Sequence, residues 1–320
     1  MLLGSVMKPY ALFFATNPRF FFSLGVLLLS LREKSPALLE QADVLIYHQG
    51  LTPAQQNLLN NIIPCQFTEY YFPLKTDFDN INFKNFTQLA FARYDIFDLL
   101  DKYKKILYMD VDILINGELL PVVEKMGNKS GIVMSQDLQK NLSLITKNFN
   151  QPLPDYDMTV PCYNSGVILF SQAIKNRKQM RMWCYQKTVQ WLENLVCPDQ
   201  GVLNVLLQEF KIPVEILPDT CNCLPANKKY YDKKSNEVLV YHCAGGGLRF
   251  WSYTWFGPWQ KFYDQYLKLG GTPHQEQEQS WLRFIKKHNL QRFSFFDRSP
   301  NPQIHPHRFI TYCCKKLVGR

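Results

Sequence analysis

The chain has 320 residues, of which 46% are hydrophobic and 14% aromatic, so it can form one large domain or two small ones and is not a disordered protein. Its net charge of +9 is concentrated at the C-terminal end, where residues 281–320 hold nine Lys and Arg against Asp297 alone. The nine cysteines are scattered without zinc-site spacing, which favours reduced structural thiols in a cytoplasm.

The N-terminal part alternates apolar strands with helical patterns. Ala11–Thr16 predicts a strand and Phe20–Arg32 a buried helix. The apolar part of that helix is too short to span a bilayer, and no small-residue cleavage site of a signal peptide follows it. Ala42–His48 predicts a second strand, and Thr52 and Pro53 then fit the N-cap and first position of a helix.

The alternation continues along the chain. Further strands are expected at Ile106–Met109, Gly131–Ser135, Ser165–Ser171 and Glu237–His242, and helices at Asn85–Lys104, Gln172–Leu195 and Gln200–Glu209. This order predicts an α/β fold with a mostly parallel sheet, in which ligands bind at the carboxyl ends of the strands. We expect a catalytic domain over residues 1–265, followed over 266–320 by a polar linker and a basic, aromatic tail.

Two aspartates end the strand Ile106–Met109. Side chains two positions apart in an extended chain point the same way, so Asp110 and Asp112 would lie together. Two close carboxylates repel each other, and a divalent cation removes that repulsion; oxygen ligands suit Mg²⁺ or Mn²⁺. The alternative is a solvated acidic turn, because Asp is common at strand ends.

Arg93 falls on the apolar face of the preceding predicted helix, together with Phe86, Leu89, Ala90, Phe97 and Leu100. Burying an unpaired arginine is costly, so we expect its guanidinium to reach a carboxylate or a phosphate at the strand ends. The alternatives are a salt bridge to a core acid and an arginine that extends its charged end to solvent.

The segment "FARYDIFDLLDKYKKILYMDVDIL" (residues 91–114) resembles family eight of the retaining glycosyltransferases, whose bacterial members add glucose or galactose to lipopolysaccharide. It has their Ala-Arg helix, hydrophobic strand and Asp-x-Asp. Four further stretches agree in order: "FFATNPRFFFSLGVLLLSL", "YNSGVILF", "PDQGVLNVLL" and "YHCAGGGLRFW". The resemblance covers roughly Ala11 to Trp259. It implies a GT-A fold (Rossmann-like, with a mostly parallel mixed sheet flanked by helices), a UDP-sugar donor and retention of anomeric configuration.

The resemblance implies that Asp110, Asp112 and His242 hold Mn²⁺, with Mg²⁺ possible. Taken alone, a histidine after a strand is more often a hydrogen-bonded structural residue. The resemblance also implies donor contacts from Ala15, Thr16, Asn17, Phe20, Arg93, Asp110, Val111, Asp112, Asn164, Gly245 and Arg249.

Some of these positions match the family pattern and others depart from it. Phe20 falls where the family has an aromatic ring that stacks on uracil, with helix core as its alternative. Asn17 replaces the usual aspartate beside the base. Residues Gly245–Gly247 would bring backbone N–H groups to the diphosphate, or form an ordinary turn. Leu248 stands at the expected lysine, so Arg249 is the nearest cation for the diphosphate.

The resemblance assigns catalysis to Asp199 and Gln200: Asp199 would bind hydroxyls of the donor sugar, and Gln200 would lie near the reacting carbon. Gly201 replaces the second acid of the family motif, and Asp137 is a weaker candidate for sugar contact. Because glutamine is a poor nucleophile, we favour same-face attack in which the leaving phosphate helps to deprotonate the acceptor.

The expected function is metal-dependent transfer of a hexose, glucose or galactose, from a UDP-sugar to a surface glycan such as lipopolysaccharide or lipooligosaccharide. A catalytically degenerate nucleotide-sugar-binding scaffold and a nucleotide-sugar hydrolase are the alternatives. The basic, aromatic tail favours peripheral contact with an anionic inner membrane from the cytoplasm, and no motif indicates nucleic acid; a basic helix packed on the domain is its alternative.

Overall fold

The computed structural model of the chain describes residues 8–76, 78, 87–137, 148–224, 235–243, 249–252 and 257–275. Gly245 and its neighbours, and the basic tail, lie outside these residues, so the predictions made for them stay predictions.

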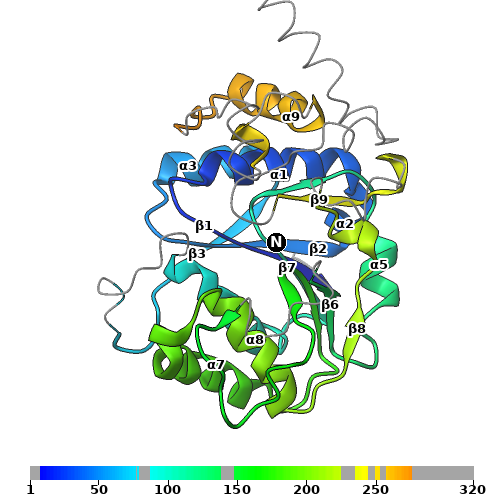
Figure 1. Cartoon of the computed structure of the whole chain (residues 1–320). Helices are drawn as coiled ribbons and strands as arrows, with labels where there is room; N and C mark the ends of the chain where they lie inside the picture. The colour runs from blue at the N-terminus through cyan, green and yellow to red at the C-terminus, as the bar shows by residue number, and fades with distance from the viewer. Residues whose placement is uncertain are drawn as a thin grey trace, which may run out of the picture.

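A seven-stranded sheet forms the centre of the molecule (Figure 1). Its order is β3-β2-β1-β4-β7-β6-β8. The strands span β1 Tyr10–Thr16, β2 Ala42–His48, β3 Cys65–Glu69, β4 Lys105–Met109, β6 Ile132–Gln136, β7 Tyr163–Ser171 and β8 Val214–Ile216. All neighbouring pairs are parallel except those that β7 makes with β4 and β6. The prediction of a mostly parallel, mixed sheet is therefore confirmed.

The reversed strand β7 decides where the site forms. Because β7 runs antiparallel to β4, its first residues lie beside the last residues of β4, and Met109 pairs with Val167. The N–H of Asp110 then donates to the carbonyl of Gly166 at 2.8 Å. A second, two-stranded sheet of β5 Ile113–Ile115 and β9 Val240–His242 brings His242 opposite Ile113.

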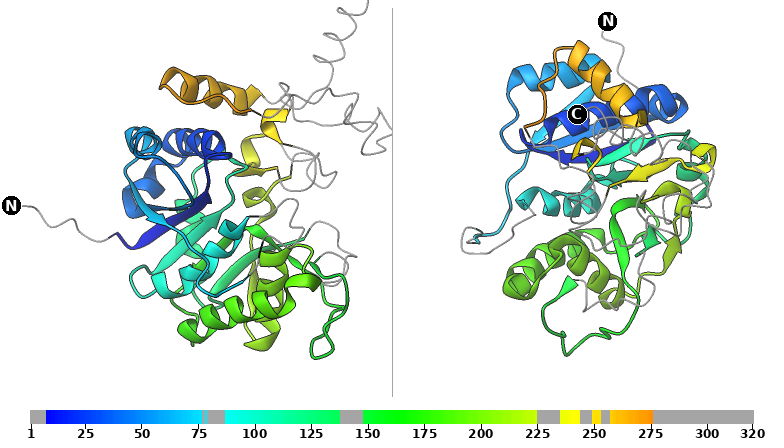
Figure 2. Two further views of the ribbon diagram at one scale, coloured as in Figure 1. Left: turned by 90° about the vertical axis from the view of Figure 1, so that its left-hand side faces the viewer. Right: turned by 45° about the horizontal axis from the view of Figure 1, so that its top comes forward.

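Helices cover both faces of the sheet, as the two turned views of Figure 2 also show. One side carries α1 Phe21–Lys34, α2 Pro36–Gln41, α3 Pro53–Ile62, α5 Leu120–Lys125 and, outermost over α1, α9 Gly257–Lys268. The other side carries the 3₁₀ helix η1 Gln88–Asp95 with α4 Ile96–Leu99, α7 Arg177–Trp191 and α8 Pro198–Glu209. Short 3₁₀ turns complete the described elements: η2 Leu192–Asn194, η3 Asp219–Cys221, η5 Ser235–Glu237 and η6 Phe250–Ser252.

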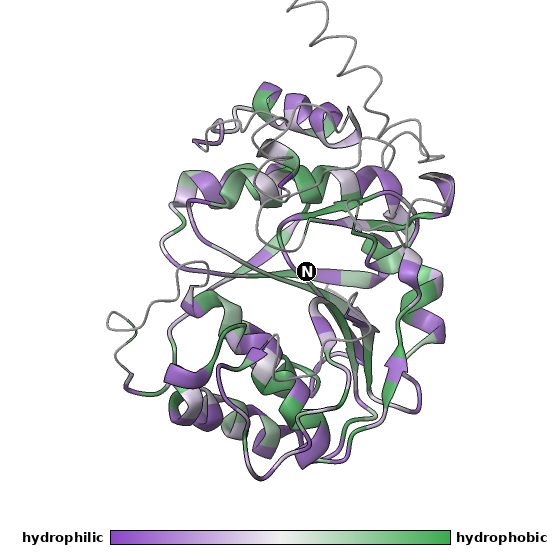
Figure 3. Ribbon diagram, viewed as in Figure 1, coloured by the Kyte–Doolittle hydropathy of each residue, from purple (hydrophilic) through white to green (hydrophobic). Residues whose placement is uncertain are grey.

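Helix α1 is buried from Phe21 to Leu31 between the sheet and α9, which explains why this part has no polar face, while its charged last turn from Arg32 to Lys34 is not buried (Figure 3). Gly25 allows that packing, because a Cβ there would lie 2.5 Å from the ring of Tyr266 on α9. Within the described residues, no helix is long and apolar enough to cross a membrane.

Two predicted helices differ most from their expected bounds. The described part of Asn85–Lys104 is a 3₁₀ helix followed by one α turn, since the chain turns at residues 100–104 to enter β4, where the N–H of Lys104 donates to Pro9. The segment Gln172–Leu195 becomes helical only at Arg177, because Asn176 adopts the left-handed conformation with φ 56°. By contrast, Thr52 caps α3 as predicted, through a reciprocal bond pair with Gln55.

The charged side chains of Glu118 and Lys105 bond the ends of helices α2 and α5. The carboxylate of Glu118 accepts bonds from the hydroxyl of Ser35 and from the N–H groups of Ala37, Leu38 and Leu120. Lys105 donates from Nζ to three carbonyls at the C-terminal end of α5. Both side chains serve the fold rather than the site.

The predicted domain division at residue 265 stays a prediction. Helix α9 continues to Lys268 and packs on α1, so the described helix crosses that boundary.

Candidate active site

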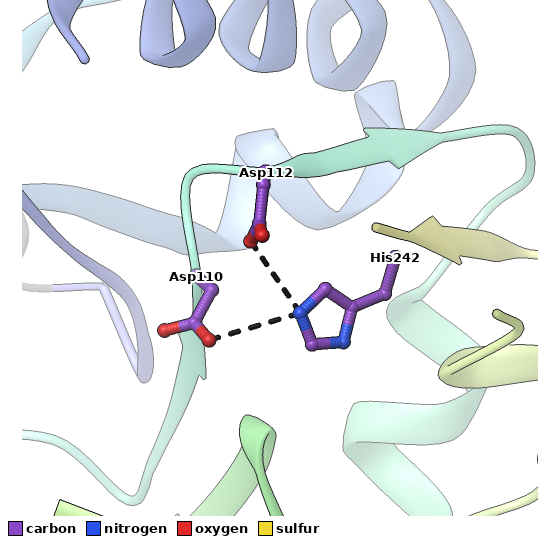
Figure 4. A group of neighbouring side chains, drawn as sticks. All are labelled: Asp110, Asp112 and His242. Atoms are coloured by element: carbon purple, nitrogen blue, oxygen red, sulfur yellow. Dashed lines mark ion pairs between the residues drawn. The ribbon is translucent and has the colours of Figure 1, made fainter. Parts of the chain in front are cut away.

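Three potential metal ligands meet above the end of β4 (Figure 4). Asp110 and Asp112 come from the turn between β4 and β5, and His242 ends β9. The Nε2 atom of His242 lies 3.7 Å from Oδ2 of Asp110 and 3.4 Å from Oδ1 of Asp112. One ligand atom from each residue lies within 4.8 Å of the others. The sequence prediction that these residues converge is confirmed.

The burial, charge and hydrogen bonds of the His242 ring suit a metal ligand. Its side chain is 1% exposed, and burial lowers the pKa of His242 to about 4, so the ring is neutral near pH 7. Nδ1 bonds Oδ1 of Asn222 at 2.7 Å, while Nε2 is buried and has no hydrogen-bond partner within the described part of the chain. A buried ring nitrogen without a hydrogen-bond partner, beside two carboxylates, suits a divalent metal, so the three side chains fit a metal ion.

Gly166 makes room for this group. A Cβ at residue 166 would lie 2.1 Å from Cε1 and 2.8 Å from Nε2 of His242, and 2.9 Å from Oδ2 of Asp110. The "NSG" of β7 therefore needs glycine for a steric reason.

Arg93 connects Asp110 to Asp199 of α8 Pro198–Glu209. It is buried and bonds Oδ1 of Asp110 at 3.1 Å, Oδ2 of Asp199 at 2.7 Å and the carbonyl of Ser165 at 2.7 Å. Its guanidinium lies 4.1 Å from the ring centroid of Tyr108, whose hydroxyl also donates to Asp110. Arg93 thus reaches a carboxylate at a strand end, as expected, and its pair with the buried Asp199 of α8 also matches the alternative of a salt bridge to a core acid.

Asp199 lies in the first turn of α8, which begins two residues earlier than predicted. Burial raises the pKa of Asp199, while Arg93 and the hydroxyl of Ser165, which donates at 2.8 Å, oppose that rise. The positive charge of Arg93 therefore lies between the carboxylates of Asp110 and Asp199 and pairs with both.

Gln200 is held by partners on both ends of its amide. Oε1 accepts from the N–H of Ser165 at 3.1 Å and from Nδ2 of Asn164 at 3.4 Å. Nε2 donates to Oδ1 of Asn148 at 3.1 Å and to Oδ2 of Asp137 at 3.4 Å. The structure brings Asp137, Asn164 and Gln200 together, which no sequence motif joined.

The residues predicted to contact the nucleotide lie at the end of β1 and the start of α1. Ala15 and Thr16 end β1, and Phe20 is half-buried, with its ring centroid 6.2 Å from that of Trp251. Oδ1 of Asn17 accepts from the N–H groups of Arg19 and Phe20 in a local turn. The carbonyl of Val111 accepts a bond from Ser23. Whether they bind a nucleotide stays a prediction.

Arg249 lies at the metal group. Its Nη1 forms an ion pair with Oδ2 of Asp112 and donates to the carbonyl of Cys243 at 3.1 Å. The predicted cation therefore lies beside the candidate metal group, where it contacts the carboxylate of Asp112.

Sequence reasoning missed the roles of Gly166, Asn222, Ser165 and Tyr108. Gly166 and Ser165 belong to the quoted "YNSGVILF", so the motif was a usable signal for them. Asn222 lies between two cysteines in a stretch without a motif, and only the folded chain reveals its contact with His242.

The sequence profile described as "Glycosyl transferase family 8" matches residues 11–254, about three quarters of the chain. The chain belongs to glycosyl transferase family 8. The resemblance drawn from the sequence motifs is confirmed, and the protein is a glycosyltransferase. Among curated proteins, no sequence matches the chain.

Solved glycosyltransferases share the fold. The galactosyltransferase LgtC, crystallised with donor and acceptor sugar analogues, is 17% identical with a TM-score of 0.59; the match covers 82% of this chain and 97% of LgtC. An apo structure of the bifunctional glycosyltransferase WbbM is 15% identical with a TM-score of 0.55, covering 88% of this chain and 52% of WbbM. Glycosyltransferase GlyE of Streptococcus pneumoniae TIGR4 is 16% identical with a TM-score of 0.51, covering 84% and 66%. The prediction of a GT-A fold is confirmed.

Proposed function

We propose that this family 8 member transfers a hexose, glucose or galactose, from a UDP-sugar to a surface glycan acceptor such as lipooligosaccharide. The observation that carries the proposal is the group of Asp110, Asp112 and His242, in which the buried Nε2 of His242 has no hydrogen-bond partner within the described residues and lies beside the two carboxylates. LgtC, which shares the fold, is a galactosyltransferase, and this likeness favours a hexose donor.

A metal bound by these three residues would supply Lewis-acid neutralisation of the diphosphate as the bond to the sugar breaks, and Mn²⁺ is the proposed ion, with Mg²⁺ possible. Arg93 would keep Asp110 in place from the protein side, and Asp199 would accept bonds from donor hydroxyls. Arg249 would leave Asp112 to bind the diphosphate, because a diphosphate is the stronger anionic partner.

We propose that the reaction proceeds on one face of the sugar. The oxygen of an acceptor hydroxyl forms the new bond to the anomeric carbon, and the electron pair of the old bond goes to the phosphate oxygen. That oxygen takes the proton of the acceptor hydroxyl, so the anomeric configuration is retained. Gln200 supports this route over a covalent one, because both ends of its amide already bond neighbours and an amide is a weak nucleophile.

The nucleotide would lie on the loop that follows β1. Phe20 offers an aromatic face for uracil, and Ala15, Thr16, Asn17 and Val111 surround the same strand ends. The glycines from Gly245 onward would cover the diphosphate, a proposal that concerns residues outside the described part.

The test is release of UDP from a panel of UDP-hexoses, with and without Mn²⁺, by wild type and Asp112→Asn. We expect metal-dependent release from one hexose, and its loss in the variant by about a hundredfold or more. Asn116→Ala, which changes an amide away from the metal group, is the control. Release that is independent of metal, or that survives in Asp112→Asn, would refute the proposed site.

In this proposal, the basic and aromatic tail of residues 281–320 indicates a lipid-linked acceptor and action at a membrane surface. Its nine cations and interspersed aromatics suit the anionic surface of the inner membrane, where lipid-linked glycans are extended. Deleting residues 281–320 should move the protein from floating vesicles of anionic lipid to the soluble fraction. An unchanged flotation profile would remove this part of the proposal.

A further inference from the structure

Asn222 bonds the ring of His242, and nothing in the family pattern or the motifs assigns it a role. It follows η3, and its 1% exposure leaves it inaccessible to solvent. Backbone bonds hold it beside β9: the N–H of His242 donates to Cys223, and the N–H of Cys223 donates to Val240. Its position is therefore determined by strand-like pairing and does not depend on its own side chain.

The polarity of the Asn222 amide is decided by a backbone group of β7. The N–H of Gly166 can only donate, and it contacts Asn164 at 3.0 Å, so that atom of Asn164 must be its oxygen, Oδ1. The same oxygen lies 2.9 Å from Asn222, which must present its Nδ2 there. The other end of the Asn222 amide is then the oxygen, and it faces Nδ1 of His242 at 2.7 Å.

An oxygen at this place forces the tautomer of the histidine. Because Oδ1 of Asn222 can only accept, Nδ1 of the neutral ring must carry the hydrogen, and Nε2 keeps its lone pair. Without Asn222, the population of the Nε2–H tautomer would increase. Its hydrogen would point at the carboxylates of Asp110 and Asp112, which lie 3.7 and 3.4 Å from Nε2. That tautomer cannot bind a metal through Nε2.

We propose that Asn222 is a positioning residue that holds His242 as the Nδ1–H tautomer, so that the Nε2 lone pair faces Asp110 and Asp112. The Gly166 N–H sets this choice through Asn164 and Asn222. The consequence for Mn²⁺ binding rests on the proposed function, whereas the tautomer itself does not.

The first measurement is the nitrogen-15 NMR spectrum of metal-free protein labelled at its six histidines, with His242 assigned by comparison with His242→Gln. The expected result is a hydrogen on Nδ1 and none on Nε2 of His242. Finding the hydrogen on Nε2 in wild type would overturn the inference before any variant of Asn222 is made.

Two variants of Asn222 separate its roles. Asn222→Leu keeps the size and removes the acceptor, so Nε2–H should become populated and Mn²⁺ affinity, measured by calorimetry, should fall by about 10- to 100-fold. Asn222→Asp keeps an acceptor for Nδ1–H and loses the donor to Asn164, so it should retain the wild-type tautomer and Mn²⁺ affinity.

The matched control is Asn116→Leu, because the half-buried Asn116 bonds Val238 just before β9 without a bond to His242. It should change neither the tautomer nor the affinity. If Asn222→Leu folds and keeps both wild-type values, or if Asn222→Asp loses the Nδ1–H tautomer, the inference is wrong. If wild type has the expected tautomer and yet binds no Mn²⁺, the proposed metal-dependent function fails and the inference about Asn222 stands.

Discussion

Replacing Gly166 by alanine would place a methyl group inside the metal group. The added Cβ would lie 2.1 Å from Cε1 of His242 and 2.9 Å from Oδ2 of Asp110. Ordinary contacts begin near 3.4 Å, so the ring would have to retreat by more than about 1 Å. The backbone of β7 cannot give way easily, because the carbonyl of Gly166 is bonded to the N–H of Asp110.

The displacement is large for a metal site. Ligand distances in such sites vary by only about 0.2 Å, so a ring displaced by more than about 1 Å no longer ligates the same ion. We expect Gly166→Ala to weaken Mn²⁺ binding by about 10- to 100-fold, which is about 1.4–2.7 kcal/mol. Overpacking should also lower the free energy of unfolding by about 1–3 kcal/mol.

The assay is calorimetric titration of Mn²⁺ into the folded variant, with urea unfolding measured in parallel. Gly25→Ala is the matched control: its Cβ would lie 2.5 Å from the Tyr266 ring, in the contact between α1 and α9 and away from the metal group. It should lose a similar free energy of unfolding and keep wild-type Mn²⁺ affinity. Unchanged Mn²⁺ affinity in Gly166→Ala would refute the steric reasoning.

Three further changes test the buried charges. Arg93→Met should lower the free energy of unfolding by about 3–5 kcal/mol, because it leaves Asp110 and Asp199 unpaired, and Arg93→Lys should recover part of the loss in urea titrations. Burial raises the pKa of Glu118, but its four hydrogen bonds lower it overall from 4.5; the carboxylate therefore stabilises the fold above that pH. Glu118→Gln should cost about 1–2 kcal/mol at pH 7, and the difference from wild type should shrink as the pH falls below 4.5. Lys105→Met should cost about 1–3 kcal/mol, because three carbonyls of α5 lose their donor.

Each of these has a contrary outcome. An Arg93→Met variant as stable as wild type would mean that solvent reaches Asp199. A pH-independent difference for Glu118→Gln would show that its charge is not the stabilising feature. An unaffected Lys105→Met would indicate that water can replace the ammonium group.

Much of the site was predictable because its residues follow local patterns. Asp110 and Asp112 directly follow an apolar strand, which marked them as candidates, although the structure places them in the turn between β4 and β5, so strand periodicity does not explain why they lie together. Arg93 stood out because it interrupts an apolar face, and its burial required an acid nearby. The pairing of Arg93 with Asp199 was not predictable, because no periodicity relates residues that far apart in the chain.

The sequence by itself determined the alternation of strands and helices, the apolar helix α1 and the motifs of the family, since these depend on neighbours a few positions apart. Only the tertiary structure decided that β7 is reversed, which brings Gly166 beside Asp110 and leaves space for His242. It also decided that Asn222 meets His242 through backbone pairing between remote segments. Hydrogen-bond polarity and steric room belong to atoms in contact, and chain order does not encode which distant atoms those are.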